Sequence, residues 1–234
     1  MSNIHQGHRA RVKEEFRKSG LSHFQDHRIL EMLLYYSVPR SDTNEMGHLL
    51  MERFGSLSGV FDSSMELLME TKGLGTESAT LIKFVSELIR AYMDDYTNVH
   101  NVITDPTSAK EYMQYKFLCR PTECIYLTCM GANGKVIFSD QIAEGSPESV
   151  HIRPADVVKA ALKANAVTAV LAHNHPNGIC TPSSRDLSAT SVLARELLRV
   201  DVELIDHIII APDGIYSMKE KGMLPVPGKS DIIY

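Results

Sequence analysis

Between residues 8 and 96, apolar side chains recur every three or four positions, which is the period of a helix with one buried face. In the stretch 77–93, for example, Leu81, Val85 and Leu88 share one side of such a helix. Further helices are predicted for a charged segment from residue 8 and for the stretches 27–38, 43–54 and 64–72. The alternation typical of strands is missing from this half. The pattern therefore predicts a helical bundle.

Beyond residue 106, short apolar runs replace the helical period. The runs 123–130 and 135–143 flank the residues Gly-Ala-Asn-Gly, a combination typical of a β-hairpin. Helical and extended patterns then alternate toward the end of the chain. Helices are predicted at 155–166 and 181–200, and strands at 166–173, 202–211 and 215–218. This alternation predicts a mixed α/β sandwich.

The composition turns polar between residues 94 and 105, and Pro106 follows, which predicts a linker between two domains. We therefore expect a helical domain over residues 1–98 and a mixed α/β domain over residues 104–234, so that the whole chain is of the α+β class. Residues 225–234 are expected to form a loose tail.

The chain has 234 residues, of which 44% are hydrophobic, enough to bury a substantial core. No apolar run approaches the roughly 18 residues that span a membrane, and the first residues lack the apolar stretch of a secretory signal. We therefore expect a cytoplasmic protein that does not cross a membrane. The four cysteines include no Cys-x-x-Cys pair, and in a reducing compartment we interpret them as buried apolar side chains rather than as a zinc cluster.

The formal net charge of −5 argues against a nucleic-acid grip by the whole surface, because phosphate contacts need clustered Lys and Arg. Two local features are nevertheless candidates for nucleic-acid binding. The segment 9–18 carries Arg and Lys, but Glu14 and Glu15 interrupt it, so a solvated helix face is the favoured interpretation. Gly73 and Gly75, between two predicted helices, allow a tight turn whose amide groups point outward and can hold a phosphate.

The string A-H-N-H-P-N-G-I-C-T-P-S-S-R-D carries the most chemical information. His173 and His175 end a predicted strand, where side chains two apart point to the same side. After a loop rich in Gly and Pro, Thr181 is predicted as the N-cap of a helix with Pro182 at its first position, so Asp186 falls in the first turn. Two imidazoles and one carboxylate are typical of a catalytic zinc site, although non-haem iron uses the same donors.

The spacing H-x-H, seven residues, Ser, two residues, Asp resembles the metal motif of the JAB/MPN (JAMM) metalloprotease domain. The motifs H-E-x-x-H of thermolysin-type proteases and H-x-E with P-C-x-x-C of zinc deaminases are absent from the sequence. The longer string HNHPNGICTPSSRD, with KANAVTAVLA before it and VDVELIDHIII after it, resembles the RadC-type (UPF0758) branch of that superfamily, and the resemblance covers nearly the whole chain. It implies a cytidine-deaminase-like mixed α/β domain behind a helix-hairpin-helix-like bundle.

In the front half, KGLGTESA stands where that branch has a Gly-hydrophobic-Gly turn followed by a more basic helix start. Glu77 and Ser78 depart from the pattern. An acidic side chain beside a phosphate-binding turn repels DNA, so DNA binding through Gly73 and Gly75 is only weakly indicated.

By resemblance, His173, His175 and Asp186 bind Zn²⁺, and Ser183 stabilises the oxyanion of a tetrahedral intermediate. The zinc keeps its fourth position for water. Cys180 lies in the same loop, but we do not expect it to ligate the metal.

The resemblance also implies a glutamate at the start of an early strand, which takes a proton from the zinc-bound water and returns it to the leaving amine. Glu123, which opens the run 123–130, fits that place best, and Glu144 is its rival. Ordinary structural roles are expected for other polar residues of this half: turn formation for Asn174 and Asn177, and strand or loop packing for His151 and His207.

The resemblance therefore implies a zinc-dependent hydrolase of the metallopeptidase or isopeptidase type, which acts on a peptide or isopeptide substrate. An alternative is a DNA-repair-associated or DNA-binding factor that acts through the helical domain. A third hypothesis is a retained fold without catalysis that acts in protein interaction. The sequence does not identify the substrate.

Overall fold

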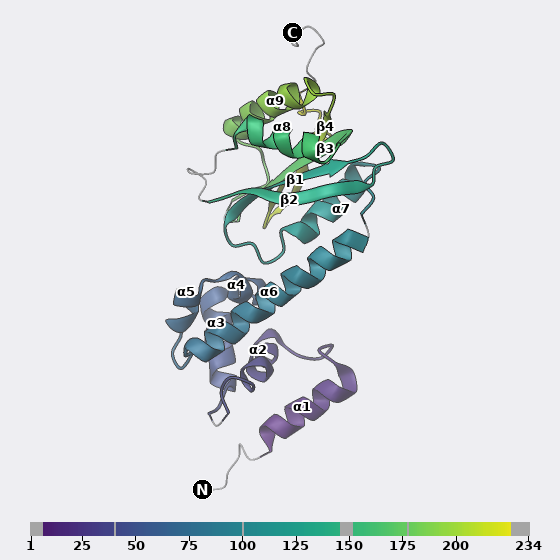
Figure 1. Cartoon of the computed structure of the whole chain (residues 1–234). Helices are drawn as coiled ribbons and strands as arrows, with labels where there is room; N and C mark the ends of the chain where they lie inside the picture. Colours follow the sequence, from purple (N-terminus) through teal and green to yellow (C-terminus); the bar gives the residue numbers. More distant parts are fainter. Residues whose placement is uncertain (1–6, 40, 100, 146–151, 177, 226–234) are drawn as a thin grey trace. The chain divides into compact units, whose positions relative to one another are not determined.

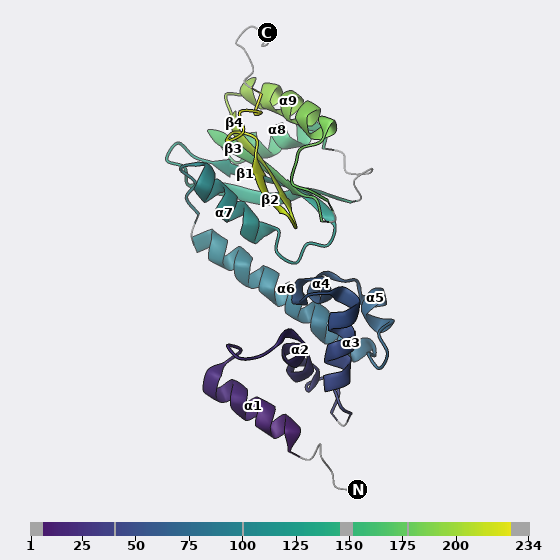
Figure 2. The same ribbon diagram turned by 180° about the vertical axis from the view of Figure 1, so that it is seen from behind.

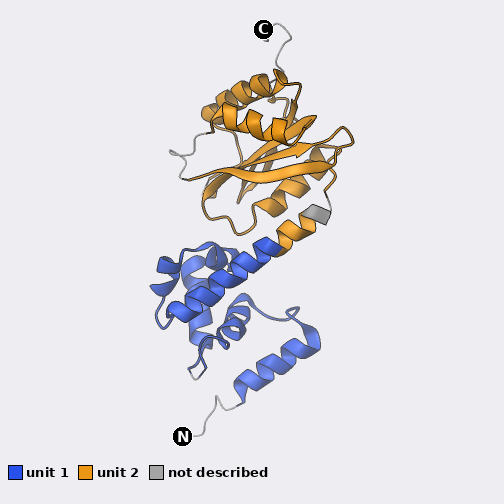
Figure 3. Ribbon diagram, in the orientation of Figure 1, with its two compact units in different colours: residues 1–91 blue, residues 92–234 orange. Residues whose placement is uncertain are grey.

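Helices form the described part of the first of two compact units, residues 1–91 (Figures 1 and 3). The computed structural model describes residues 7–39, 41–99, 101–145, 152–176 and 178–225. The helices of this unit are α1 (His8–Ser19), α2 (Asp26–Leu34), α3 (Asn44–Phe54), α4 (Leu57–Asp62), α5 (Met65–Met69) and the first part of α6 (Thr76–Val99). The prediction of a helical bundle is confirmed. It did not include α4, which is capped by the side chain of Ser56.

Apolar side chains from α2 to α6 make the core of the first unit. Its buried members are Leu30, Leu34, Leu50, Val60, Leu68, Leu74, Ala79 and Ile82. The backbones of α2 and α3 approach closely at Gly47, where an added Cβ would lie 2.3 Å from the main-chain oxygen of His27. A larger residue at Gly47 would therefore push the two helices apart.

The turn between α5 and α6 contains the two glycines singled out in the sequence. Gly73 has a φ of 86°, in the left-handed region that favours glycine. Glu77 is exposed in the first turn of α6, whereas Ser78 is buried and its hydroxyl lies 3.0 Å from that of Ser37. Of the two residues that depart from the branch pattern, only Glu77 faces solvent.

Helix α6 crosses the boundary between the units, so residues 94–99 of the predicted linker are helical. The polar composition does not end the helix there, because no Gly or Pro occurs before Pro106. Soon after the helix, the carbonyl of Asn101 accepts a hydrogen bond of 2.7 Å from the amide of Val136 in the second unit. Neither α6 nor any other helix in the described ranges combines the length and the apolar run needed to cross a bilayer.

After the end of α6, the second unit, residues 92–234, contains a helix that the sequence pattern did not predict, α7 (Pro106–Lys116). Pro106 was expected to mark a linker, but it occupies the first helical position, where a proline has no amide bond to lose. Asp105 caps the helix, because its side chain accepts from the amides of Thr107 and Ser108 while the Ser108 hydroxyl bonds back to the Asp105 amide.

A mixed sheet of five strands in the order β2-β1-β3-β4-β5 forms the centre of the second unit. The strands are β1 (Glu123–Met130), β2 (Val136–Gly145), β3 (Thr168–Asn174), β4 (Glu203–Ala211) and β5 (Gly214–Ser217). Neighbouring strands are antiparallel except β3 and β4, which are parallel. The predicted hairpin around Gly-Ala-Asn-Gly and the later alternation of helices and strands are both confirmed.

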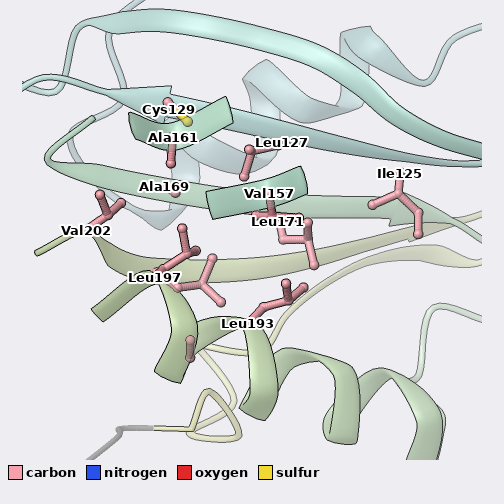
Figure 4. Close-up of a cluster of buried hydrophobic side chains, with 12 residues drawn as sticks. Ile125, Leu127, Cys129, Val157, Ala161, Ala169, Leu171, Leu193, Leu197 and Val202 are labelled. Carbon is pink, nitrogen blue, oxygen red and sulfur yellow. The ribbon is translucent and has the colours of Figure 1, made fainter. Parts of the chain in front are cut away.

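Helices cover both faces of this sheet (Figures 1 and 2). Helices α8 (Pro154–Lys163) and α9 (Ser184–Leu198) lie on one face and α7 lies on the other. Leu127 of β1 and Leu171 of β3 pack with the side chains of α8 and α9 (Figure 4), whereas Val170 packs with Met113 of α7. Because side chains alternate along a strand, His173 faces the same layer as Leu171.

Candidate metal centre

Strand β3 carries the two predicted histidines to its end. Nε2 of His173 lies 2.9 Å from Nε2 of His175, so the two rings meet on one side of the strand as the spacing predicts. His173 is 2% exposed, and His175, just beyond the strand, is half-buried. The other ring nitrogen of His175, Nδ1, lies 2.7 Å from the carbonyl oxygen of Ile179. A carbonyl only accepts, so Nδ1 of His175 carries a proton, and in the neutral ring that a metal ligand requires Nε2 presents a lone pair.

Asp186 comes from the first turn of α9. The predicted N-cap at Thr181, with Pro182 in the helix, is wrong: Ser183 is the N-cap. Its hydroxyl accepts from the Asp186 amide, and Oδ2 of Asp186 accepts from the amide of Ser183 at 2.8 Å and from its hydroxyl at 2.6 Å. In this reciprocal capping box the side chain three positions after the cap bonds back to the amide of the cap, as the Asp186 carboxylate does to Ser183.

The carboxylate of Asp186 completes a group of three side chains. Oδ1 of Asp186 lies 3.3 Å from Nε2 of His173, and Oδ2 lies 3.8 Å from Nε2 of His175. One ligand atom from each residue lies within 4.8 Å of the other two, so the group could hold a metal ion. The structure thus brings together the three residues that the sequence singled out.

A cavity of about 880 Å³ opens onto this group, and Glu123 at the start of β1 lines it together with Ser183. Burial raises the pKa of the Glu123 carboxyl above 4.5, opposed by the charge of His175 and reinforced by the charge of Asp186. Glu144 is not among the residues that line the cavity. Its carboxylate accepts hydrogen bonds from the side chains of Thr122, at 2.6 Å, and Gln141, at 2.7 Å.

Asn174 lies in β3 and does not form a turn, contrary to the expectation for it. Its side chain is buried on the face opposite His173. The side-chain oxygen accepts from the amide of Cys124 at 2.8 Å, and the side-chain nitrogen donates to the carbonyls of Arg120 and Thr122 at 3.2 and 3.0 Å. These bonds fasten the backbone on both sides of Glu123. Asn177 lies outside the described residues.

His207 and Thr190 lie next to the ligand group; the sequence predicted only a structural role for His207 and gave no indication of Thr190. Nε2 of His207, on β4, lies 2.8 Å from Nδ1 of His173, and Nδ1 of His207 lies 2.5 Å from Oγ1 of Thr190 on α9. His207 also lines the cavity, so the purely structural role expected for it is incomplete. Burial lowers the pKa of His207 well below 6.5, and burial also lowers that of His173, to about 4. A histidine inside the apolar run of β4 is the signal that the sequence offered.

The remaining candidates lie apart from the group. Cys180 is not a member of the metal-binding group found among the described residues, and its amide donates to Asp213 at 2.9 Å. Cys124 and Cys129 are buried as expected, whereas Cys119 and Cys180 are partly exposed. His151 lies outside the described residues.

The basic segment of the first unit lies on α1. Arg17 and Lys18 lie 3.2 and 3.8 Å from the carboxylate of Glu14, and all three side chains are more than half exposed. These pairs within one helix agree with the solvated helix face that the charge pattern favours.

A mixed sheet with helices on both faces, with two histidines at the end of one strand and an aspartate at the start of the next helix, has the layout of a JAB-type domain. A family model described as "RadC-like JAB domain" matches residues 103–223. A UPF0758 protein of Fusobacterium nucleatum is 32% identical over 94% of this chain and 97% of its own length. A UPF0758 protein of Variovorax paradoxus is 33% identical over 92% and 96%, and one of Paraburkholderia xenovorans is 28% identical over 90% and 83%. The chain therefore belongs to the RadC-like JAB domain family, UPF0758, over most of its length.

Proposed function

We propose that the chain is a zinc-dependent hydrolase that cleaves a peptide or isopeptide bond. The observation that carries the proposal is the meeting of His173, His175 and Asp186 at a cavity that Glu123 and Ser183 also line. The second unit is accordingly a JAB/MPN metalloprotease domain of the cytidine-deaminase-like class.

The three side chains fit a zinc ion. Two ligand atoms at about 2.05 Å from a tetrahedral zinc lie about 3.3 Å apart. The separations between ligand atoms in the group are 2.9, 3.3 and 3.8 Å, although the last two involve different oxygens of Asp186. Two neutral imidazoles and one carboxylate also leave a fourth position for water or substrate, as catalytic zinc sites do.

When bound, zinc lowers the pKa of a water from about 15.7 toward 7 and polarises a carbonyl. In our proposal Glu123 accepts the proton that the water loses. The water oxygen bonds to the carbonyl carbon, the carbon–nitrogen bond breaks, and Glu123 returns the proton to the leaving nitrogen. A carboxyl whose pKa burial has raised holds that proton more readily than an ordinary one.

Ser183 has a second task in this proposal, because its hydroxyl stabilises the oxyanion that forms on the carbonyl oxygen. The hydroxyl currently donates to Oδ2 of Asp186 at 2.6 Å. It must rotate away from Asp186 to donate to the substrate, and the Ser183 amide then keeps the carboxylate in place.

Metal analysis of the purified full-length chain tests the proposal. We expect one zinc per chain, and loss of that zinc in His173→Ala and Asp186→Ala. Asp156→Ala is a matched control, because Asp156 occupies the same third helical position in α8 that Asp186 occupies in α9. Titration with Fe²⁺ without oxygen tests the alternative metal. A wild-type chain that holds no divalent ion would overturn the proposal.

Hydrolysis itself is tested on a library of peptides derived from a digested proteome, with cleavage followed by mass spectrometry. We expect new peptide termini with the zinc-loaded wild type and none with His173→Ala. Zinc binding without any cleavage in this screen or in a screen of isopeptide-linked peptides would favour the hypothesis of a fold that acts in protein interaction.

We further propose, as a second candidate function, that the first unit contacts DNA through the turn between α5 and α6. The observation in its favour is the left-handed Gly73, exposed together with Gly75 ahead of the amino end of α6. Fluorescence anisotropy of the full-length chain with duplex DNA is expected to show binding that weakens as salt rises. Glu77→Lys should strengthen it, and absence of binding at low salt would reject this role.

A further inference from the structure

A buried chain of hydrogen bonds runs from the main chain of Asp186 to the ring of His173. Oγ1 of Thr190 lies 2.5 Å from the carbonyl oxygen of Asp186 and 2.5 Å from Nδ1 of His207. Nε2 of His207 then lies 2.8 Å from Nδ1 of His173. Thr190, His207 and His173 are each no more than 2% exposed. Because these buried groups bond to one another, the donor atom of each hydrogen bond can be assigned.

The donor and acceptor of each of these hydrogen bonds follow from the carbonyl oxygen of Asp186, because a carbonyl oxygen has no proton and can only accept. Thr190 has one hydroxyl hydrogen, and it must point at the oxygen of Asp186, since two oxygens 2.5 Å apart without a hydrogen between them would repel each other. Oγ1 of Thr190 is therefore the acceptor in its second bond. Nδ1 of His207 is the donor.

The same reasoning passes along the ring of His207. The His207 side chain is buried in β4, and in a neutral ring a proton on Nδ1 leaves a lone pair on Nε2. Nδ1 of His173 must then donate to that lone pair, and Nε2 of His173 is left without a proton. That atom faces Nε2 of His175 and the carboxylate of Asp186.

We propose that Thr190 and His207 are positioning residues that fix His173 in the tautomer and ring orientation that a metal ligand needs. The inference rests on the proposed function and goes beyond it. Asp186 then contributes to the metal centre twice. Its carboxylate is a ligand, and its main-chain carbonyl sets the direction of the hydrogen-bond relay formed by Thr190, His207 and His173. The tautomer of His175 is fixed without such a relay, because its Nδ1 donates directly to the carbonyl of Ile179.

Nitrogen NMR of the metal-free, full-length chain with ¹⁵N-labelled histidine reads the tautomer itself. The ring resonances are assigned with single His→Gln substitutions. We expect His173 and His207 to carry their protons on Nδ1. A wild-type spectrum in which His173 is protonated on Nε2 would overturn the inference, whether or not any variant folds.

Zinc affinity measured by competition with a chromophoric chelator is the second test. Thr190→Val keeps the shape of the side chain and removes the hydroxyl, and we expect the dissociation constant of zinc to rise about 10- to 100-fold. Thr190→Ser restores the hydroxyl and should bring it back near the wild-type value. Thr128→Val is the matched control, since Thr128 is also fully buried and bonded through its hydroxyl, to Ser139 at 2.8 Å.

The two proposals fail in different ways. A wild-type chain without zinc refutes the proposed function. A wild type that binds zinc while Thr190→Val binds it equally well, with the His173 resonances unchanged, refutes only the relay. Loss of zinc affinity in Thr190→Val but not in Thr128→Val, with recovery in Thr190→Ser, supports the relay.

Discussion

Glu123 stands where β1 begins, at the wall of the cavity and outside the group of three ligands. Substitution Glu123→Gln removes the proposed proton acceptor but keeps the size of the side chain. We expect kcat to fall about 100-fold or more, while the zinc content stays at the wild-type level.

Glu144→Gln is the control for that substitution, because the Glu144 carboxylate is already engaged by Thr122 and Gln141. It should leave kcat close to wild type. The reverse result, with Glu144→Gln inactive and Glu123→Gln active, would transfer the role of general base to Glu144.

The pH profile follows from the same carboxyl. Glu123 must be deprotonated to accept a proton, and burial raises its pKa above 4.5. The rise of kcat/KM with increasing pH should therefore have its midpoint above pH 4.5. Hydrolysis that is fully active below that pH would contradict this assignment.

The start of β1 is held in register by β3 through one side chain, that of Asn174. Substitution Asn174→Asp keeps the oxygen that accepts from Cys124 but places a second oxygen against the carbonyls of Arg120 and Thr122. We expect a loss of about 1–3 kcal/mol in the free energy of unfolding, and a lower kcat because Glu123 is no longer held in place. Urea denaturation and steady-state kinetics measure the two effects.

Asn133→Asp provides the matched control for this clamp. Asn133 accepts a hydrogen bond from the amide of Lys135 through its side-chain oxygen, which an aspartate retains. Equal effects of the two substitutions would show that the bonds of Asn174 have no special part in placing Glu123.

Helices α1, α2 and α3 are joined at Glu31, which is fully buried. Its carboxylate accepts from His8 at 2.7 Å, Tyr35 at 2.6 Å and Asn44 at 2.8 Å. Burial alone would raise the pKa of Glu31, but these hydrogen bonds outweigh it and the pKa lies below 4.5.

A carboxyl with a lowered pKa stabilises the folded state above its unfolded pKa and loses that contribution as the pH falls through the folded value. The first unit should therefore lose stability below pH 4.5, and Glu31→Gln should remove this part of the pH dependence. Urea unfolding followed by circular dichroism at pH 3 to 7 measures both. An unchanged pH dependence in the variant would show that other groups are responsible.

Each unit of the chain has its own core, since every cluster of buried apolar residues within the described ranges belongs to one unit or the other. Leu50→Ala should destabilise the first unit by about 2–5 kcal/mol through the cavity it leaves. The affinity for zinc should not change, because the ligands belong to the second unit. Calorimetry with and without zinc should show that the metal raises only the transition of the second unit.

Leu197→Ala, in the core beside α9, is the counterpart in the second unit. It should lower the transition that zinc raises. A change of zinc affinity in Leu50→Ala as large as that in Leu197→Ala would mean that the two units unfold together through α6.

Much of the second unit follows from short-range patterns. The sequence predicted the strand over 123–130 and its hairpin partner. It also predicted the group of His173, His175 and Asp186, because the two histidines are two positions apart on a strand and a single loop joins them to the aspartate. The capping residues of α7 and α9 are also present in the sequence, but Pro106 was interpreted as marking a linker and Thr181 as an N-cap. A proline can end one helix or begin the next, and the choice depends on which side-chain bonds the neighbours make.

The surroundings of the ligands could not be read in this way. His207 follows His173 by 34 positions and meets it only because β3 and β4 pair in parallel. Glu123 faces the cavity, and Glu144 does not line it, because of the register of β1 against its neighbours. The spacing of His173, His175 and Asp186 along the chain therefore determined the proposed ligand set. Only the pairing of the strands and the burial of the sheet faces decided which distant side chains, such as His207, lie against those ligands, because such contacts join residues far apart in the sequence.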